Sequence, residues 1–519
     1  MIVKLKKIID MKKNIMICLP LGIALSLAGC SDFLEPEPKG KFTEDNFFTN
    51  QLDAINAVSG IYARILEEDG FVGGDELKYE GCADDVFINS DHDDIDPQVL
   101  YFTIRPDNAG LANRQWPVKY EVVSRANFVL LNVAKMSRDQ ITEEIQNRCL
   151  GEAYFLRAFA HWSLYLVHGE IPVMTVEDVE KNNYNKPKNT IDEVLGQIEY
   201  DLLQAAALLP ATTPAAEGGR VHKGSAWAYL TQLYMHWSCF DGKDAYLDKA
   251  IEAGNHIVGN SDYAMRPGVD GFRECFTLRN AQINTEVLFQ LNNGDGKGYG
   301  FEFGYFWQPR PWGGYEWCFP TQSLVDAFKS GGTDDPRFAA TIMADGEVVT
   351  AHGGGSKIFV ADDMYNPTGC NYFKKNSQFE LSDDGESFDT DRGSVAVMMR
   401  SSDVYLLVAE AKIRKGQSGD VEINAVRNRV GAPTKTGYTA ADLVLERRLE
   451  LAAEGRRFFD LRRWDRKKFG GVDIVALTAT FGPNNEPRTF QRPKHYFFPI
   501  PQDQIDKTNG VLKQNPAYL

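Results

Sequence analysis

The sequence has little that would mark an enzyme, a metalloprotein or a nucleic-acid-binding protein. It contains no HExxH, GxSxG or GxxxxGK[ST] motif, which argues against zinc-protease, serine-hydrolase and P-loop chemistry. Its eight cysteines include no CxxC pair, so no metal or redox motif is indicated. Positive charge is in the minority, with 56 lysines and arginines against 72 acidic residues, and such a surface repels nucleic acid. We therefore predict no metal, no cofactor and no nucleic-acid partner.

The N-terminal residues have the pattern of a bacterial export signal. Two adjacent lysines precede an apolar run over 15–28, which ends in Leu-Ala-Gly-Cys at Cys30. A basic start, a short apolar run and small residues before the cleavage point are typical of a secretory signal, and this run is too short to cross a bilayer comfortably. The Leu-Ala-Gly-Cys string resembles a bacterial lipobox; an ordinary cysteine after a cleaved signal is the alternative. We predict a signal peptide over 1–29 and a lipidated, acidic tether over 30–41.

Along most of the remaining chain, apolar residues recur at three- and four-residue steps, as on one face of a helix. The segments with this pattern are 52–67, 115–135, 141–167, 191–209, 223–237, 246–257, 403–415, 421–430 and 443–464. Small and aromatic residues alternate in several of them, which resembles the helix pairs of tetratricopeptide repeats. We predict a mainly α fold: a tetratricopeptide-repeat-like helical scaffold over about 42–266 and 395–519, with long loops and a small mixed α/β insertion over about 267–394.

The densest signal is the stretch 446–464, ERRLELAAEGRRFFDLRRW. Its apolar residues follow helical spacing, and its charges alternate in sign. Opposite charges three residues apart pair on a helix surface, which predicts pairs of Glu454 with Arg457 and of Asp460 with Arg463. Gly455 costs about 1 kcal/mol in a helix interior, so its presence suggests that another backbone packs closely there. A solvated, salt-bridged surface helix is the simpler alternative.

Three strings near the C-terminus together resemble the SusD/RagB family of nutrient-binding outer-membrane lipoproteins. They are EGRRFFDLRRW at 454–464, HYFFPIPQDQID at 495–506 and LKQNPAYL at 512–519, and their order, spacing and terminal placement match the family. The string GEAYFLRA at 151–158 is similar to the repeat-like helices of the family. The resemblance extends over nearly the whole mature chain, 42–519.

The resemblance implies binding without catalysis. Members lie on the cell surface as lids on a TonB-dependent outer-membrane transporter and hand a glycan or oligosaccharide to it; peptides are the alternative ligand, through the RagB branch. Asp32, soon after the lipidated Cys30, is similar to the surface-export signal of Bacteroidota lipoproteins. In the family, ligand contacts come from the insertion and from the loop after the first helix, without a fixed motif.

Two regions therefore supply the candidate ligand-binding residues. An aromatic cluster over 299–317 offers flat rings for the apolar faces of sugars, with polar groups between them. Core packing of a small β-rich insertion is the alternative. The earlier loop, 70–113, offers further polar and aromatic groups. The candidates are Trp307, Trp312, Trp317, Tyr315, Arg310, Tyr79, Asp84 and Asn89.

Other functions are open to the same residues. The acidic run over 91–96 lacks the glycine and glutamate of an EF-hand loop, so a solvated loop is the preferred interpretation. A secreted glycoside hydrolase needs two placed carboxylates, and no pair is singled out by its spacing. A structural partner that binds only the transporter is a third possibility. We predict a non-enzymatic, surface-exposed outer-membrane lipoprotein that binds a glycan and delivers it to the transporter.

Overall fold

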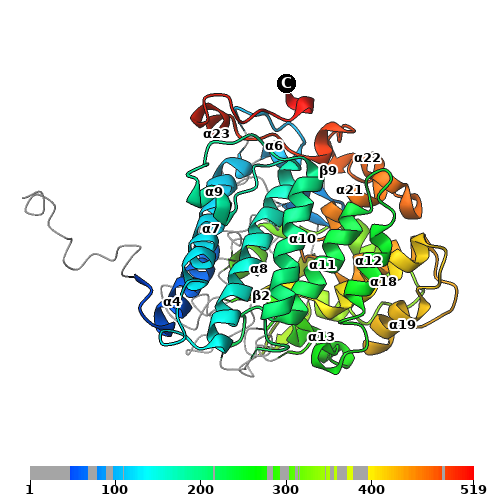
Figure 1. Cartoon of the computed structure of the whole chain (residues 1–519). Helices are drawn as coiled ribbons and strands as arrows, with labels where there is room; N and C mark the ends of the chain where they lie inside the picture. The colour runs from blue at the N-terminus through cyan, green and yellow to red at the C-terminus, as the bar shows by residue number, and fades with distance from the viewer. Residues whose placement is uncertain are drawn as a thin grey trace, which may run out of the picture. The chain divides into compact units, whose positions relative to one another are not determined.

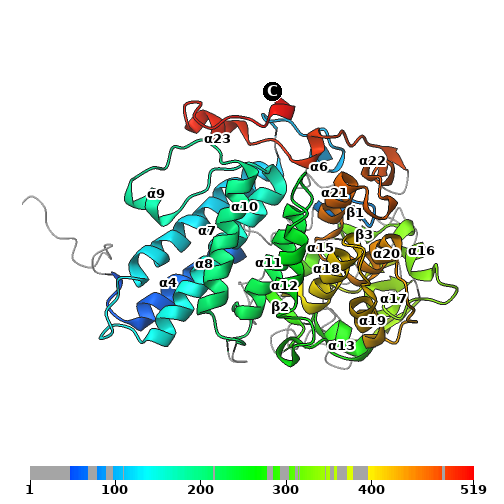
Figure 2. The ribbon, with the colours of Figure 1, turned by 45° about the vertical axis from the view of Figure 1, so that its right-hand side comes forward.

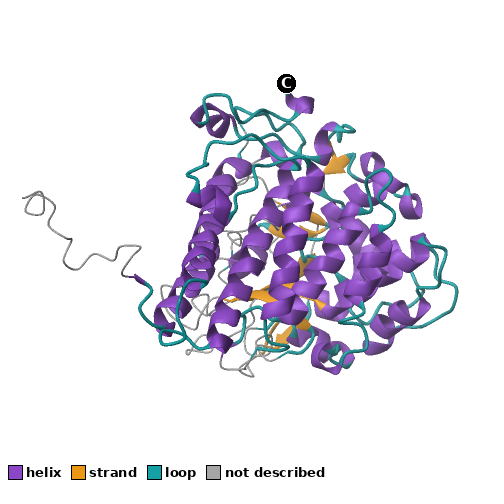
Figure 3. Cartoon of the chain, in the orientation of Figure 1, coloured by secondary structure: helices purple, strands orange, loops and turns teal. Residues whose placement is uncertain are grey.

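The computed structural model is built mainly from α-helices, with a few short strands between them (Figure 3). Its described residues are 47–67, 79–88, 97–108, 110–213, 217–277, 284–292, 303–309, 314, 316–344, 346–350, 356–358, 371–377, 395–481 and 485–519. Asn50–Leu519 form one compact unit. Cys30 and the predicted signal peptide and tether lie outside the described residues. No helix among those described is both long and apolar enough to cross a membrane.

Long helices form one continuous stack in which each packs against the next (Figure 1). In packing order they are α4 (Gln51–Leu66), α7 (Leu111–Val133), α8 (Glu143–His168), α10 (Ile191–Leu208), α11 (Lys223–Trp237), α12 (Tyr246–Gly254), α18 (Ser401–Arg414) and α19 (Asp420–Arg429). The stack passes directly from α12 to α18 although the chain between them is long. The predicted repeat-like, mainly helical scaffold is thereby confirmed.

Capping boxes help to fix where several helices of the protein begin. In each, a polar side chain accepts a hydrogen bond from the third residue of the helix, and the carboxylate of that residue accepts one from the cap backbone. The boxes pair Asn50 with Asp53, Thr190 with Glu193 and Thr439 with Asp442. A cap of this kind stabilises its helix by about 1 kcal/mol.

The insertion leaves and rejoins the helical frame through one antiparallel ladder. Its strands are β2 (Val287–Asn292) and β8 (Val395–Arg400), with Leu291 opposite Ala396. Because the insertion begins and ends on neighbouring strands, the helical stack can continue across it without a break. This local closure is why a long excursion is tolerated inside the repeat-like frame.

The remaining strands and helices stand outside this series. The strands are β1 (Val86–Ile88), β3 (Cys318–Pro320), β4 (Ile342–Ala344), β5 (Val348–Thr350), β6 (Ser356–Ile358), β7 (Asn371–Phe373), β9 (Thr480–Phe481) and β10 (Glu486–Pro487). The helices are α6 (Pro97–Leu100), α9 (Val176–Glu180), α13 (Gly268–Glu274), α15 (Phe303–Trp307), α16 (Gln322–Lys329), α17 (Phe338–Thr341), α20 (Ala440–Glu450), α21 (Arg457–Lys467), α22 (Ile474–Leu477) and α23 (Gln502–Lys507). Buried free thiols are found at Cys82, Cys149, Cys239, Cys275 and Cys318.

The charged stretch is not one helix, which corrects the sequence-based prediction. It consists of α20 and α21 joined by a tight turn, in which Ala453 has φ 61° and Gly455 has φ 73°. Gly455 therefore supplies a left-handed backbone conformation rather than room for a neighbouring chain. The predicted pair of Asp460 with Arg463 is present at 2.8 Å, whereas Glu454 binds Arg400 and Lys375 instead of Arg457. These side chains are buried, so the surface-helix alternative is also wrong.

Candidate functional site

The two regions that the sequence singled out meet at one small ladder. Strands β1 and β3 pair antiparallel, with Val86 opposite Pro320 and Ile88 opposite Cys318. In an antiparallel pair, the end of one strand lies beside the start of the other. The chain that continues after Ile88 and the chain that arrives at Cys318 therefore share one end of the ladder. Figure 2 shows β1 and β3 together, near α15 and α21.

Buried aromatic rings form the base on which this ladder rests. Phe306 stacks on Trp317 with ring centroids 4.6 Å apart, and Trp307 meets Phe373 edge-on at 5.1 Å. Trp307 is completely buried, and Trp317 is 8% exposed. Phe319 of β3 packs between Phe87 and Tyr372.

These positions correct the predicted role of two candidates. A ring that is covered on all sides cannot stack on a sugar, so Trp307 belongs to the packed base, and Trp317 is almost as covered. For these two rings the core-packing alternative is the better description. Trp312, Tyr315, Arg310 and Asn89 lie outside the described residues.

Backbone hydrogen bonds fix the two ends of the segment that contains Trp312. The amide of Gly314 donates to the carbonyl of Pro309 at 3.1 Å, and that of Glu316 donates to the carbonyl of Gln308 at 3.1 Å. A Cβ atom at Gly314 would lie 2.0 Å from the Gln308 carbonyl oxygen, so only glycine fits there. The carboxylate of Glu316 also accepts a hydrogen bond from the Tyr372 hydroxyl. Both ends of this short segment are thus held on the rigid base.

Tyr79 and Asp84 are positioned as structural groups rather than as ligand contacts. Tyr79 is buried against Phe459 and Phe498, and its hydroxyl donates to Gln115 at 3.3 Å. The Asp84 carboxylate accepts two hydrogen bonds from Arg457, at 2.8 and 3.0 Å. Although burial alone would raise it, the charge and hydrogen bonds of Arg457 hold the pKa of Asp84 at about 2.

Residues of α20, of α21 and of the turn between them hold the earlier loop through three acidic residues. Besides the Asp84–Arg457 pair, Arg448 donates to Asp85 at 2.6 Å. The backbone amide of Arg456 donates to Glu80 at 2.8 Å. The residues directly before β1 are therefore fixed to the charged stretch.

The same stretch holds the insertion through a buried group of charges, which sequence reasoning missed. Arg337 donates to Glu446 at 2.7 Å and to Glu450 at 3.0 Å. Lys375 pairs with Glu454 at 2.5 Å. Against the cost of burial, the charges of Arg429, Arg400 and Arg337 lower the pKa of Glu450. The stretch 446–457 thus connects both loop regions to the helical frame.

The ionisation of Glu80 should make the stability of the folded protein depend on pH. Burial, with the neighbouring Asp85 charge, raises its pKa from 4.5 to about 8. The folded protein then binds this proton more tightly than the unfolded chain, so its contribution to stability falls as pH rises from 4.5 to about 8. Glu80→Gln keeps an oxygen for the Arg456 amide and cannot ionise. We expect its stability relative to the parent to rise by about 1.4 kcal/mol per pH unit between pH 5 and 7, and to level off above the raised pKa, in urea unfolding.

Glu252→Gln is the matched control for this measurement, because Glu252 is exposed on α12. It should keep the pH dependence of the parent. Identical stability profiles for the parent and Glu80→Gln between pH 5 and 8 would mean that Glu80 does not titrate in that range.

Two family models match successive parts of the chain. The model described as the SusD family matches residues 285–518, and the model described as starch-binding associating with outer membrane matches residues 32–235. The chain belongs to the SusD/RagB family. The resemblance seen in its three C-terminal strings is confirmed.

Relatives in the family match over most of their length. A SusD-like protein, P2, of Formosa agariphila is 25% identical, and the match covers 96% of this chain and 98% of the relative. A SusD-like protein of Bacteroides ovatus is 24% identical, over 85% and 81% of the two chains. The fold is shared with a SusD-like protein of Bacteroides fragilis (TM-score 0.75, 22% identity, 92% and 99% covered) and with a laminarin-binding SusD-like protein (TM-score 0.71, 23% identity, 91% and 100% covered).

Proposed function

We propose that this chain is a lipid-anchored cell-surface protein that binds a glycan or oligosaccharide, leaves it unchanged and delivers it to a TonB-dependent outer-membrane transporter. The observation that carries the proposal is the β1–β3 ladder, because it gathers the two candidate loop regions at one end of a rigid aromatic base. Two structural relatives support the ligand class: one is a laminarin-binding SusD-like protein, and one is surface glycan-binding protein A of Bacteroides fluxus.

In this proposal, one set of residues supports the site and a second set contacts the ligand. The buried rings Trp307 and Trp317 hold the ladder and the ends of the segment before it. Trp312 and Tyr315 supply the ring faces that stack on the sugar, and Arg310 and Asn89 supply polar contacts to its hydroxyl groups. A rigid base lowers the entropy lost when such contacts form. Lipid at Cys30 keeps the protein at the membrane.

A glycan array probed with the purified protein from residue 31 to residue 519, which leaves out the predicted signal peptide and Cys30, tests the proposal. We expect binding to one class of neutral oligosaccharide and no increase in reducing ends during prolonged incubation. Release of reducing ends would assign a glycoside hydrolase instead. Binding only to a parallel peptide array would assign the peptide-uptake alternative, and no ligand on either array, with retained binding to the transporter, would leave a structural partner.

A further inference from the structure

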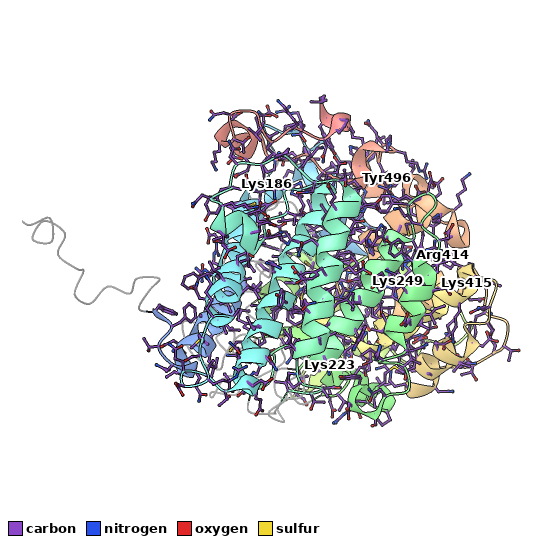
Figure 4. All side chains as sticks on the ribbon, in the orientation of Figure 1. Lys186, Lys223, Lys249, Arg414, Lys415 and Tyr496 are labelled. Carbon is purple, nitrogen blue, oxygen red and sulfur yellow. The ribbon has the colours of Figure 1, made fainter. Side chains whose placement is uncertain are left out.

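A second concave site lies on the helical scaffold, away from the β1–β3 ladder. It is a cleft of about 560 Å³ between the exposed face of α10 and the segment that contains α9 and the residues after it. Residues that line it include Asn183, Lys186, Glu193, Gln197 and Tyr200. Figure 4 labels Lys186 on this side of the protein, and Figure 2 shows α9 and the β1–β3 ladder on opposite sides of the ribbon.

The charges around this cleft are already compensated within the protein. Lys186 lies 2.8 Å from Asp178 and also donates to the Val173 carbonyl at 2.8 Å. Lys181 pairs with Glu177. Glu193 accepts hydrogen bonds from the backbone and side chain of Thr190, which lower its pKa. Because both lysines are paired with carboxylates, the described lining offers no free cation to a phosphate, and no cluster of metal-ligating side chains is found among the described residues.

Neutral polar groups and one aromatic ring are left to face a ligand. Gln197 uses its amide nitrogen on Asp201 at 2.9 Å, and no described residue donates to its amide oxygen. Asn183 likewise uses its amide nitrogen on Asp178 at 2.9 Å. Tyr200 is 50% exposed, and its ring meets Tyr154 edge-to-face with ring centroids 6.2 Å apart. Amide oxygens beside an open aromatic face match the hydroxyl groups and apolar face of a sugar.

We propose that this cleft is a second carbohydrate-binding site, which takes one or two neutral sugar residues. Its volume falls within the range of about 300–1,000 Å³ that small-ligand sites occupy. The choice of carbohydrate rests on the proposed function. A long glycan that engages both the loop region and this cleft is held with an avidity that neither site supplies alone.

The test is saturation-transfer NMR with the methyl α- and β-glycosides of glucose, galactose, mannose and xylose, on the full mature protein. We expect the parent to saturate at least one of them. Tyr200→Ala should reduce that signal at least fivefold, and Gln197→Ala should also reduce it. Tyr184→Ala should leave it unchanged, because Tyr184 is 59% exposed on the neighbouring segment but does not line the cleft.

Trp312→Ala separates this proposal from the proposed function. It should remove oligosaccharide binding at the loop region and leave the methyl glycoside signal intact. The second site is contradicted if no glycoside is saturated by the parent, or if the signal survives Tyr200→Ala. If the parent gives a methyl glycoside signal but binds no oligosaccharide, only the proposed function is contradicted.

Discussion

Arg400→Met is expected to lower the free energy of unfolding by about 3–5 kcal/mol, because it removes one cation from a buried group of carboxylates and leaves part of their negative charge uncompensated. Arg400 is completely buried and donates to Glu286 at 2.6 Å, to Glu450 at 2.9 Å and to Glu454 at 2.6 and 2.9 Å. Methionine fills a similar volume but cannot compensate charge. Urea unfolding of the parent and the variant at pH 7 measures the difference.

The size of this loss should depend on pH. In the parent, the surrounding cations lower the pKa values of Glu450 and Glu454 below the usual 4.5, so their contribution to stability is present above about pH 4.5 and is lost as pH falls through the lowered values. Without Arg400 these carboxylates protonate more easily, and the deficit of the variant should shrink below pH 4.5. Arg105→Met is the control, since the Arg105–Asp107 pair is exposed and should contribute at most about 1 kcal/mol. A loss for Arg400→Met as small as that of the control would contradict the structural role of the buried charges.

Trp307→Ala is expected to lose stability, whereas Trp312→Ala is expected to lose glycan binding. Trp307 is completely buried against Phe373, so its removal should cost about 3–5 kcal/mol of stability through the cavity that it leaves. Trp312→Ala should change stability by less than about 0.5 kcal/mol and weaken glycan binding at least about tenfold. Urea unfolding and calorimetry with the bound oligosaccharide measure the two effects.

Trp227→Ala is the control for ligand binding. Trp227 stacks on His256 in the helical frame, and its removal should leave glycan affinity unchanged. If Trp312→Ala binds the glycan as tightly as the parent does, the stacking role proposed for Trp312 is wrong. If Trp307→Ala is as stable as the parent, Trp307 is not part of a packed base.

The helical scaffold could be predicted from the sequence because its evidence is local. Apolar spacing within one segment indicates a helix, and a polar residue three positions before an acid indicates where it begins, as Thr190 and Glu193 do for α10. The prediction of an insertion over about 267–394 rests on the same kind of evidence, because the helical spacing stops there.

The convergence of the two loop regions could not be predicted from the residues alone. Strands β1 and β3 have three residues each, too few for a periodic pattern, and they lie far apart in the chain. The aromatic cluster also does not reveal which of its rings are covered, and the packing of Trp307 against Phe373 is seen only in the structure. The resemblance to the family indicated that the earlier loop and the insertion both contact ligand, which the spacing of apolar residues could not indicate.

The role of the charged stretch was hidden for a related reason. Its acids pair with Arg337, Lys375 and Arg400, which the sequence places far away. Alternating charges within one segment more often indicate a solvated helix surface. The density of opposite charges beside buried aromatic residues was the available signal, and it indicated an unusual segment without revealing its partners.

We propose that a glycan is held where the chain after β1 and the chain before β3 come together. Hydrogen exchange of the mature protein, with and without the oligosaccharide that binds it best on the array, tests this most directly. We expect slower exchange on binding in both 86–100 and 304–320. Protection in only one of these segments, or in neither, would contradict it.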